Sequence, residues 1–206
     1  MHTKKQVAKH SETTPSVIDI ELLALDLSSC TRCLGTLDHI EKAIDIIRPV
    51  MEVMETQVNA KRIVVKSQEQ ARRYQFVTSP TVRVNGKDIA LETLESECKS
   101  CTDLCGCDEG ISCRVWRYRG EEYTEAPVGL IVESILREIF GGSHDAFGAM
   151  PEYRGVPENL RRFFSSKSDT RPAEACCSPT EEETICEPRE KSACCDTSQP
   201  ETCGCQ

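Results

Sequence analysis

Cys30 and Cys33 form a CxxC motif, the spacing in this chain best suited to thiol chemistry. They stand at the start of an expected helix, where unpaired N–H groups and the helix dipole lower a thiol pKa from about 8.5. Cys30 is the predicted nucleophile, Arg32 adds positive charge beside it, and the more shielded Cys33 can resolve a mixed disulfide. Two alternatives stay open: the pair fills space in the core, or it is half of a zinc site. Asp26 is either a proton acceptor for Cys33 or a solvent-exposed carboxylate.

A second group of cysteines is crowded into a short stretch that we expect to be a flexible loop anchored to a strand. Four of its thiols could surround one tetrahedral Zn(II), and thiolates also suit Cu(I) or an iron–sulfur cluster. The same residues could instead form disulfides, including a relay that exchanges with the CxxC pair, or they could be inert. The candidate metal ligands here are Cys98, Cys101, Cys105, Cys107 and Cys113.

The carboxyl-terminal segment, residues 165–206, carries seven of the 14 cysteines, nine acidic and four basic residues, and Ile185 as its one large apolar residue. Such a composition predicts disorder unless a metal orders the segment. Close-set thiols can converge on one soft ion, which suits two-coordinate Hg(II) or Cu(I) and three-coordinate As(III). The alternative is an acidic extension with incidental cysteines. The candidate ligands are Cys176, Cys177, Cys194, Cys195, Cys203 and Cys205.

Composition narrows the classes of function. The chain has 206 residues, a net charge of -9 and 5% aromatic residues, so it lacks the basic surface that nucleic acid or anionic membrane would need. Its polar amino terminus has no apolar signal segment, which predicts a cytoplasmic protein. In a reducing cytosol clustered cysteines are more often metal ligands or redox thiols than static disulfides, and a secreted, disulfide-bonded protein is the alternative. Phosphate-binding and dinucleotide motifs are absent, so we expect no nucleotide cofactor.

The elements that must position the CxxC motif follow a β, α, β, α, β, β order. A strand over 17–27 leads to a helix whose apolar residues Leu37, Ile40, Ile44 and Ile47 recur at helical spacing, with a kink at Pro49. The remaining expected elements are a strand over 62–66, a helix over 67–74 capped by Ser67, and a hairpin of 81–84 with 88–91 about Asn85-Gly86.

The second half of the chain adds a hairpin of 113–118 with 122–125 about Arg119-Gly120, then a helix from Val128 that stops at Gly141. Residues 160–164 form a short amphipathic segment docked on the domain. We therefore expect a disordered amino terminus (1–16), a domain over 17–140 with a Cys-rich insertion at 98–113, a loop with the docked segment (141–164), and the disordered tail.

The CxxC at the start of the first helix and the Ser79-Pro80-Thr81 sequence opening the hairpin resemble a thioredoxin-like fold. This resemblance implies an α/β, thioredoxin-like βαβαββα core with a Cys-rich β-hairpin insertion. It also implies that Pro80 is a cis-proline facing the CxxC, with the Ser79 backbone available to pair with an extended substrate. Cys30, Cys33 and Pro80 would then be the catalytic residues.

A closer similarity is to DUF2703, an uncharacterised bacterial and archaeal family, over roughly residues 17–140. It rests on the CxRC motif at 30–33, SPTVRVNG at 79–86, the cysteines ending at Cys113, and YTEAP at 123–127 before a helix. The paired tail cysteines resemble those of arsenical metallochaperones.

These patterns predict a thiol protein that binds or transfers soft metals or metalloids (As, Hg, Cu or Zn). A thiol–disulfide oxidoreductase using Cys30 and Cys33 is the alternative, and a metal-storage or structural zinc protein is a third. The expected partners are the ions and a protein thiol, without nucleic acid or membrane.

Overall fold

A mixed α/β arrangement is built around one four-stranded sheet in the computed structural model, which describes residues 16–90, 92–140 and 152–169. The sheet order is β2-β1-β3-β4. Central β1 (Val17–Ala24) runs parallel to β2 (Gln57–Val64) and antiparallel to β3 (Thr81–Val84), which pairs with β4 (Lys87–Asp88). The order of elements expected as far as residue 94 is confirmed, although β2 begins five residues earlier than its β-branched core indicated.

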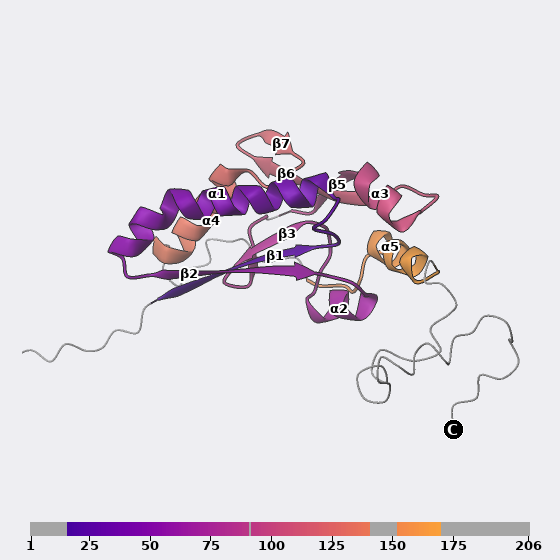
Figure 1. The fold of residues 1–206 in the computed structure, drawn as a ribbon, viewed down its shortest axis with the longest axis horizontal. Helices are drawn as coiled ribbons and strands as arrows, with labels where there is room; N and C mark the ends of the chain where they lie inside the picture. The colour runs from indigo at the N-terminus through magenta and orange to yellow at the C-terminus, as the bar shows by residue number, and fades with distance from the viewer. Residues whose placement is uncertain (1–15, 91, 141–151, 170–206) are drawn as a thin grey trace, which may run out of the picture. The chain divides into compact units, whose positions relative to one another are not determined.

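Strand β1 can be central because its buried residues alternate along the first part of the strand and are consecutive from Leu22 to Ala24. Ile18, Ile20 and Leu22 are buried on the face covered by α1, while the polar residues between them lie on the other face, which is partly open to solvent. Toward the carboxyl end Leu23 is buried as well, because α2 (Gln68–Arg73) lies across that end of the second face (Figure 1). Both faces of the sheet are therefore covered where the strand leads into the CxxC motif.

Helix α1 (Thr31–Val53) begins directly after Cys30 and runs along the sheet beside α4 (Val128–Phe140) (Figure 1). Its buried residues, which include Cys33, Ile40 and Ile47, follow helical spacing and face β1. The helix continues through Pro49 for another four residues. The expected N-cap of α2 is confirmed, since Ser67 Oγ accepts a hydrogen bond of 3.2 Å from the Gln70 N–H.

A second sheet, in the order β5-β6-β7, carries the cysteine-rich stretch. Its strands are β5 (Leu94–Glu97), β6 (Ser112–Tyr118) and β7 (Glu121–Tyr123), and β6 pairs antiparallel with both neighbours. The expected turn at Arg119-Gly120 is confirmed, and both residues have the positive φ that such a turn requires.

The expectation of a flexible loop between Cys98 and Cys113 is wrong, because residues Lys99–Cys105 form helix α3 between β5 and β6. Cys98 occupies the N-cap position, and Gly106 ends the helix in the left-handed conformation. The Thr102 hydroxyl accepts the Ile111 N–H at 2.8 Å and so closes the return to β6. A helix of this length has little stability in isolation, and tertiary contacts therefore stabilise it.

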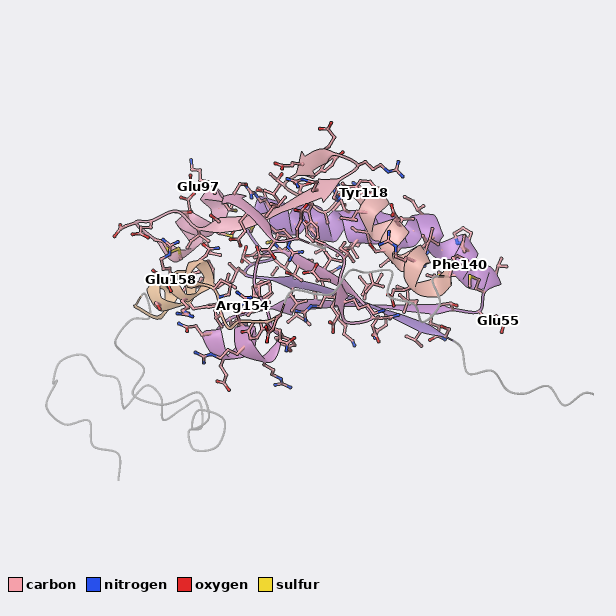
Figure 2. The ribbon with its side chains drawn as sticks, turned by 180° about the vertical axis from the view of Figure 1, so that it is seen from behind. Glu55, Glu97, Tyr118, Phe140, Arg154 and Glu158 are labelled. Carbon is pink, nitrogen blue, oxygen red and sulfur yellow. A yellow bond between two sulfur atoms is a disulfide. The ribbon has the colours of Figure 1, made fainter. Side chains whose placement is uncertain are left out.

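Helix α5 (Glu158–Asp169) confirms the docked amphipathic segment and extends it at both ends. Its Leu160, Phe163 and Phe164 side chains are buried in the same apolar cluster as the cysteines of α1 and α3. Glu158 on α5 and Glu97 on β5 lie at one end of the domain, and Glu55 and Phe140 lie at the other (Figure 2). Within the described residues, no helix is long and apolar enough to cross a membrane.

Candidate functional site: a buried cluster of thiols

The turn before α1 is built by the side chain of Asp26. Its carboxylate accepts the backbone N–H groups of Ser28 (3.0 Å), Ser29 (2.6 Å) and Cys30 (2.8 Å), together with both serine hydroxyls. Burial alone would raise the pKa of Asp26, but these hydrogen bonds hold it well below its ordinary value. The interpretation of Asp26 as a solvent-exposed carboxylate is wrong, because the residue is 9% exposed and its carboxylate organises the turn that presents Cys30.

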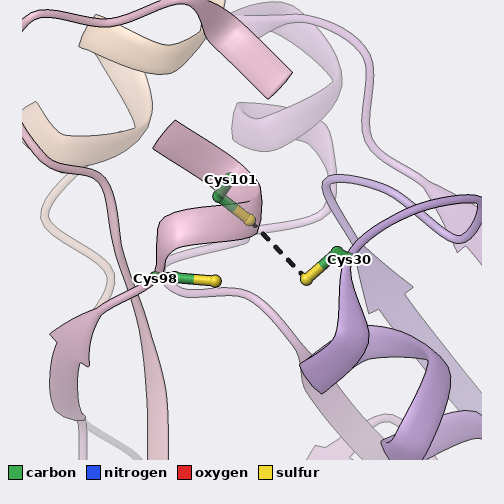
Figure 3. Close-up of side chains that lie close together, drawn as sticks. All are labelled: Cys30, Cys98 and Cys101. Atoms are coloured by element: carbon green, nitrogen blue, oxygen red, sulfur yellow. Dashed lines mark hydrogen bonds between the residues drawn. The ribbon is translucent and has the colours of Figure 1, made fainter. Parts of the chain in front are cut away.

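Three thiols from two distant parts of the chain meet at this turn. The Sγ atoms of Cys30, Cys98 and Cys101 all lie within 4.8 Å of one another, with 3.7 Å between Cys101 and Cys30 (Figure 3). Cys113 Sγ is 3.2 Å from Cys101 Sγ. We call these four residues the thiol cluster. The second sheet thus brings three of the five cysteines expected in the Cys-rich stretch onto the CxxC motif.

The spacing of the thiol cluster resembles that of ligands around an ion. A tetrahedral zinc–thiolate site with bonds of about 2.3 Å has sulfurs about 3.8 Å apart. A disulfide would bring two sulfurs to about 2.05 Å. All four residues are free cysteines, and each is at most 3% exposed. The geometry therefore suits thiolate coordination of a soft ion, and the buried setting would shield such an ion from water.

The thiols also hydrogen-bond to one another. The Cys101, Cys113, Cys33 and Cys98 side chains, in that order of effect, hold the pKa of Cys30 far below its ordinary value. Contacts with Cys101 and Cys113 lower the pKa of Cys98 to about 7. The pKa of Cys113 is raised, first by Cys101 and then by Cys30. Hydrogen bonds from neighbouring thiols thus lower the pKa of Cys30, a cause that the sequence alone did not indicate.

Cys33 lies next to the thiol cluster and faces the proline turn. Its Sγ is 3.5 Å from Ser79 Oγ, which also accepts the Leu25 N–H at 3.0 Å. Contact with Cys30 and burial raise the pKa of Cys33. The predicted cis bond between Ser79 and Pro80 is confirmed. Cys30 and Cys33 are both 0% exposed.

The backbone beside Pro80 is already paired. The Ser79 carbonyl accepts the Arg114 N–H of β6 at 2.7 Å. This corrects the expectation that the Ser79 backbone is available to an extended substrate, because the chain's own strand occupies its carbonyl. The Arg114 guanidinium, which is 1% exposed, forms a two-pronged ion pair with Asp88 on β4 at 2.7 Å for each hydrogen bond. Strand β6, and with it Cys113, is thereby fixed against the first sheet.

Arg32, which lies inside the CxxC motif, binds the backbone of the second sheet. Its guanidinium donates to the carbonyl oxygens of Glu97 (2.6 Å), Ser96 (3.3 Å) and Cys113 (3.3 Å), and to the Ser96 hydroxyl (3.0 Å). The positive charge expected beside Cys30 thus serves to hold β5 and β6 of the second sheet against the start of α1. Since Glu97 precedes Cys98, this contact sets the distance between the two halves of the thiol cluster.

The remaining candidate ligands are not members of the thiol cluster. Cys105 and Cys107 are joined by a disulfide at the end of α3, with Cys105 buried and Cys107 partly exposed. The candidate ligands of the tail lie outside the described residues: Cys176, Cys177, Cys194, Cys195, Cys203 and Cys205.

Comparison with known proteins yields one family. A family model described as a domain of unknown function, DUF2703, matches residues 17–135, which contain β1, the CxxC motif, the whole thiol cluster and most of α4. No curated protein and no solved structure matches the chain, so the similarity of the tail to arsenical metallochaperones has no support from these comparisons. Because the match covers more than half of the chain, this protein belongs to the DUF2703 family.

Proposed function

We propose that this protein binds a soft metal or metalloid ion through Cys30, Cys98 and Cys101, with Cys113 as a fourth thiol beside them. The observation that carries the proposal is the convergence of three buried Sγ atoms within 4.8 Å. Thiolates select soft ions such as Zn(II), Cu(I), Hg(II) and As(III) over hard oxygen-seeking cations. The three mutually close thiols fit a three-coordinate ion, and Cys113 would complete a four-coordinate one.

The scaffold of this site is, in our proposal, a thioredoxin-like domain. Three features support it: the strand order β2-β1-β3-β4, the CxxC motif at the start of α1, and the cis Ser79–Pro80 bond beside Cys33. The paired cysteines of the tail would act as a second set of soft-ion ligands that collects ions for the domain. Transfer between the two sets would make the protein a carrier as well as a binder.

Thiol–disulfide oxidoreduction at Cys30 and Cys33 is the second candidate. The thiolate character of Cys30 and the adjacent Cys33 favour it. Burial weighs against it, because a protein disulfide cannot reach a sulfur that is 0% exposed without opening the second sheet. Coordination of a single ion needs no such access for a large partner, so we place ion binding first.

The test is a titration of the anaerobically purified full-length chain in which all seven tail cysteines are replaced by serine. Zn(II), Hg(II) and As(III) are titrated separately, with bound ion and free thiols counted at each point. We expect one ion per chain, with the loss of three or four titratable thiols. Cys30→Ser, Cys98→Ser and Cys101→Ser should each weaken binding by at least about tenfold.

The matched control is the Cys105→Ser, Cys107→Ser double variant, because those residues lie on or next to α3 but outside the thiol cluster. It should bind with unchanged stoichiometry. Absence of stoichiometric binding of all three ions, or equal loss in the control and the cluster variants, would remove the proposal and leave the oxidoreductase as the better candidate.

A further inference from the structure

The disulfide at the end of α3 offers solvent a route to thiols that are otherwise enclosed. Among the cysteines of the described residues, Cys107 alone is partly exposed, while Cys30, Cys33, Cys98, Cys101, Cys105 and Cys113 are buried. Among these described cysteines, exchange with a soluble thiol or disulfide would therefore begin at Cys107. Binding of an ion at the thiol cluster makes no use of this pair.

Cys101 lies between that disulfide and the CxxC motif. On α3, Cys101 and Cys105 are four residues apart, a spacing that places side chains on the same helix face, and both are buried in one apolar cluster. On its other side, Cys101 Sγ is 3.7 Å from Cys30 Sγ (Figure 3). Cys33 adjoins Cys30 in turn, so Cys101 stands between the end of α3 that carries the disulfide and the CxxC pair.

We propose that Cys101 transfers a disulfide between the Cys105–Cys107 pair and the Cys30/Cys33 pair. Cys101 gives up its proton as its sulfur attacks Cys105 Sγ, the Cys105–Cys107 bond breaks, and Cys107 leaves as a thiolate that takes up that proton. Cys30 then attacks Cys101 and releases Cys105, and Cys33 attacks Cys30 and releases Cys101. The net change oxidises the Cys30/Cys33 dithiol, reduces the Cys105–Cys107 disulfide, and moves two protons from the first pair to the second.

The last step has a group placed to assist it. Ser79 Oγ, 3.5 Å from Cys33 Sγ, can hydrogen-bond to the Cys33 thiolate as it attacks. The result matters for the ion site, because Cys30 held in a disulfide with Cys33 can no longer be a ligand. This regulatory consequence depends on the proposed function, whereas the exchange itself does not.

The experiment follows the disulfides directly. The fully reduced chain, with the seven tail cysteines replaced by serine, receives one equivalent of oxidised glutathione in the presence of a chelator, so that no metal takes part. Samples are quenched by alkylation over time, and their disulfides are mapped by mass spectrometry. We expect Cys105–Cys107 to form first and to decline as Cys30–Cys33 appears. In Cys101→Ser the second disulfide should form at least about tenfold more slowly, because its carrier is missing.

Cys98→Ser is the control, since Cys98 belongs to the thiol cluster but not to the route, and it should transfer at the unaltered rate. Cys33→Ser is a positive test that does not depend on the folding of the Cys101 variant: removing the resolving thiol should trap a Cys30–Cys101 disulfide. Trapping of that link supports the proposal. Its absence, an unchanged rate in Cys101→Ser, or equal slowing in Cys98→Ser would overturn it. Because this experiment contains no metal, a negative result would not count against ion binding. A negative result in the ion titration would likewise not count against disulfide transfer.

Discussion

The guanidinium of Arg32 donates a hydrogen bond of 2.6 Å to the carbonyl oxygen of Glu97, 65 residues away along the chain. Arg32 follows one cluster cysteine and Glu97 precedes another, so this contact joins the two segments that supply the thiol cluster. The guanidinium can donate to several carbonyl oxygens at once, an arrangement that the point charge of a lysine cannot reproduce.

Arg32→Ala should therefore weaken ion binding without removing a ligand. Loss of an interaction that orients ligands typically lowers metal affinity by about 10- to 100-fold, and Arg32→Lys should recover only part of it. Competition with a chromophoric chelator measures the affinity. Arg48→Ala is the control, because Arg48 lies on the same helix in an exposed pair with Asp45. Unchanged affinity in Arg32→Ala would contradict the positioning role.

Asp26 should make stability depend on pH. Its pKa in the folded protein is below the ordinary value of 3.8, so its contribution is present above that value and is lost as the pH falls through the lower folded pKa. Asp26→Asn should lower the free energy of unfolding at pH 7 by about 2 kcal/mol, since it weakens charge-assisted hydrogen bonds. Denaturant unfolding measured between pH 7 and pH 2 should show this difference shrinking with acid. A constant difference over that range would count against the assignment.

Removing one partner of the buried Arg114–Asp88 pair should be strongly destabilising. Asp88→Ala leaves a guanidinium that is 1% exposed without its counter-ion, which typically costs about 3–5 kcal/mol. The same variant should loosen β6 and raise the alkylation rate of Cys113. Asp45→Ala, which breaks an exposed pair, should change the unfolding free energy by less than about 1 kcal/mol. Similar decreases in the free energy of unfolding for Asp88→Ala and Asp45→Ala would show that burial of the ion pair does not determine how much its loss destabilises the protein.

Helix α5 should protect the cysteines that share its apolar cluster. Phe163 is 1% exposed, and Phe163→Ala should cost about 3–5 kcal/mol through the cavity that it leaves. Alkylation of Cys101 and Cys105 in the native, reduced protein should become faster at concentrations of denaturant too low to unfold the domain. Ser165→Ala, a change at an exposed position on the same helix, should leave the alkylation rates near those of the original chain.

The sequence was sufficient to predict the elements whose residues interact locally. The spacing of Ile40, Ile44 and Ile47 indicated α1, and Asn85-Gly86 marked the hairpin, because periodicity and turn chemistry act over a few residues. Helix α3 was missed because its seven residues contain Leu104 as the one large aliphatic side chain, and its stability comes from contacts with distant segments.

The thiol cluster could be predicted only as a list of cysteines. Cys98, Cys101 and Cys113 reach Cys30 because β5 pairs with β6 in one register and because Arg32 and Ser79 fasten that hairpin to the first sheet. Such pairings link residues far apart in the chain, and no local pattern encodes them. For the same reason the sequence did not distinguish the disulfide pair Cys105 and Cys107 from the other three cysteines.

Because the thiol cluster joins residue 30 to residues 98–113, it exists only in the finished tertiary structure. A nascent or unfolded chain carries the same thiols, yet it must close a loop of about 70 residues before three of them can share one ion. An ion bound there would thus link distant segments as a cross-link does, and dissociation would be coupled to separation of the second sheet from the first. Cysteines that are neighbours in the sequence, such as Cys176 and Cys177, have no such loop to close, so under the proposed function the one chain would combine ligands available at synthesis with ligands available only after folding.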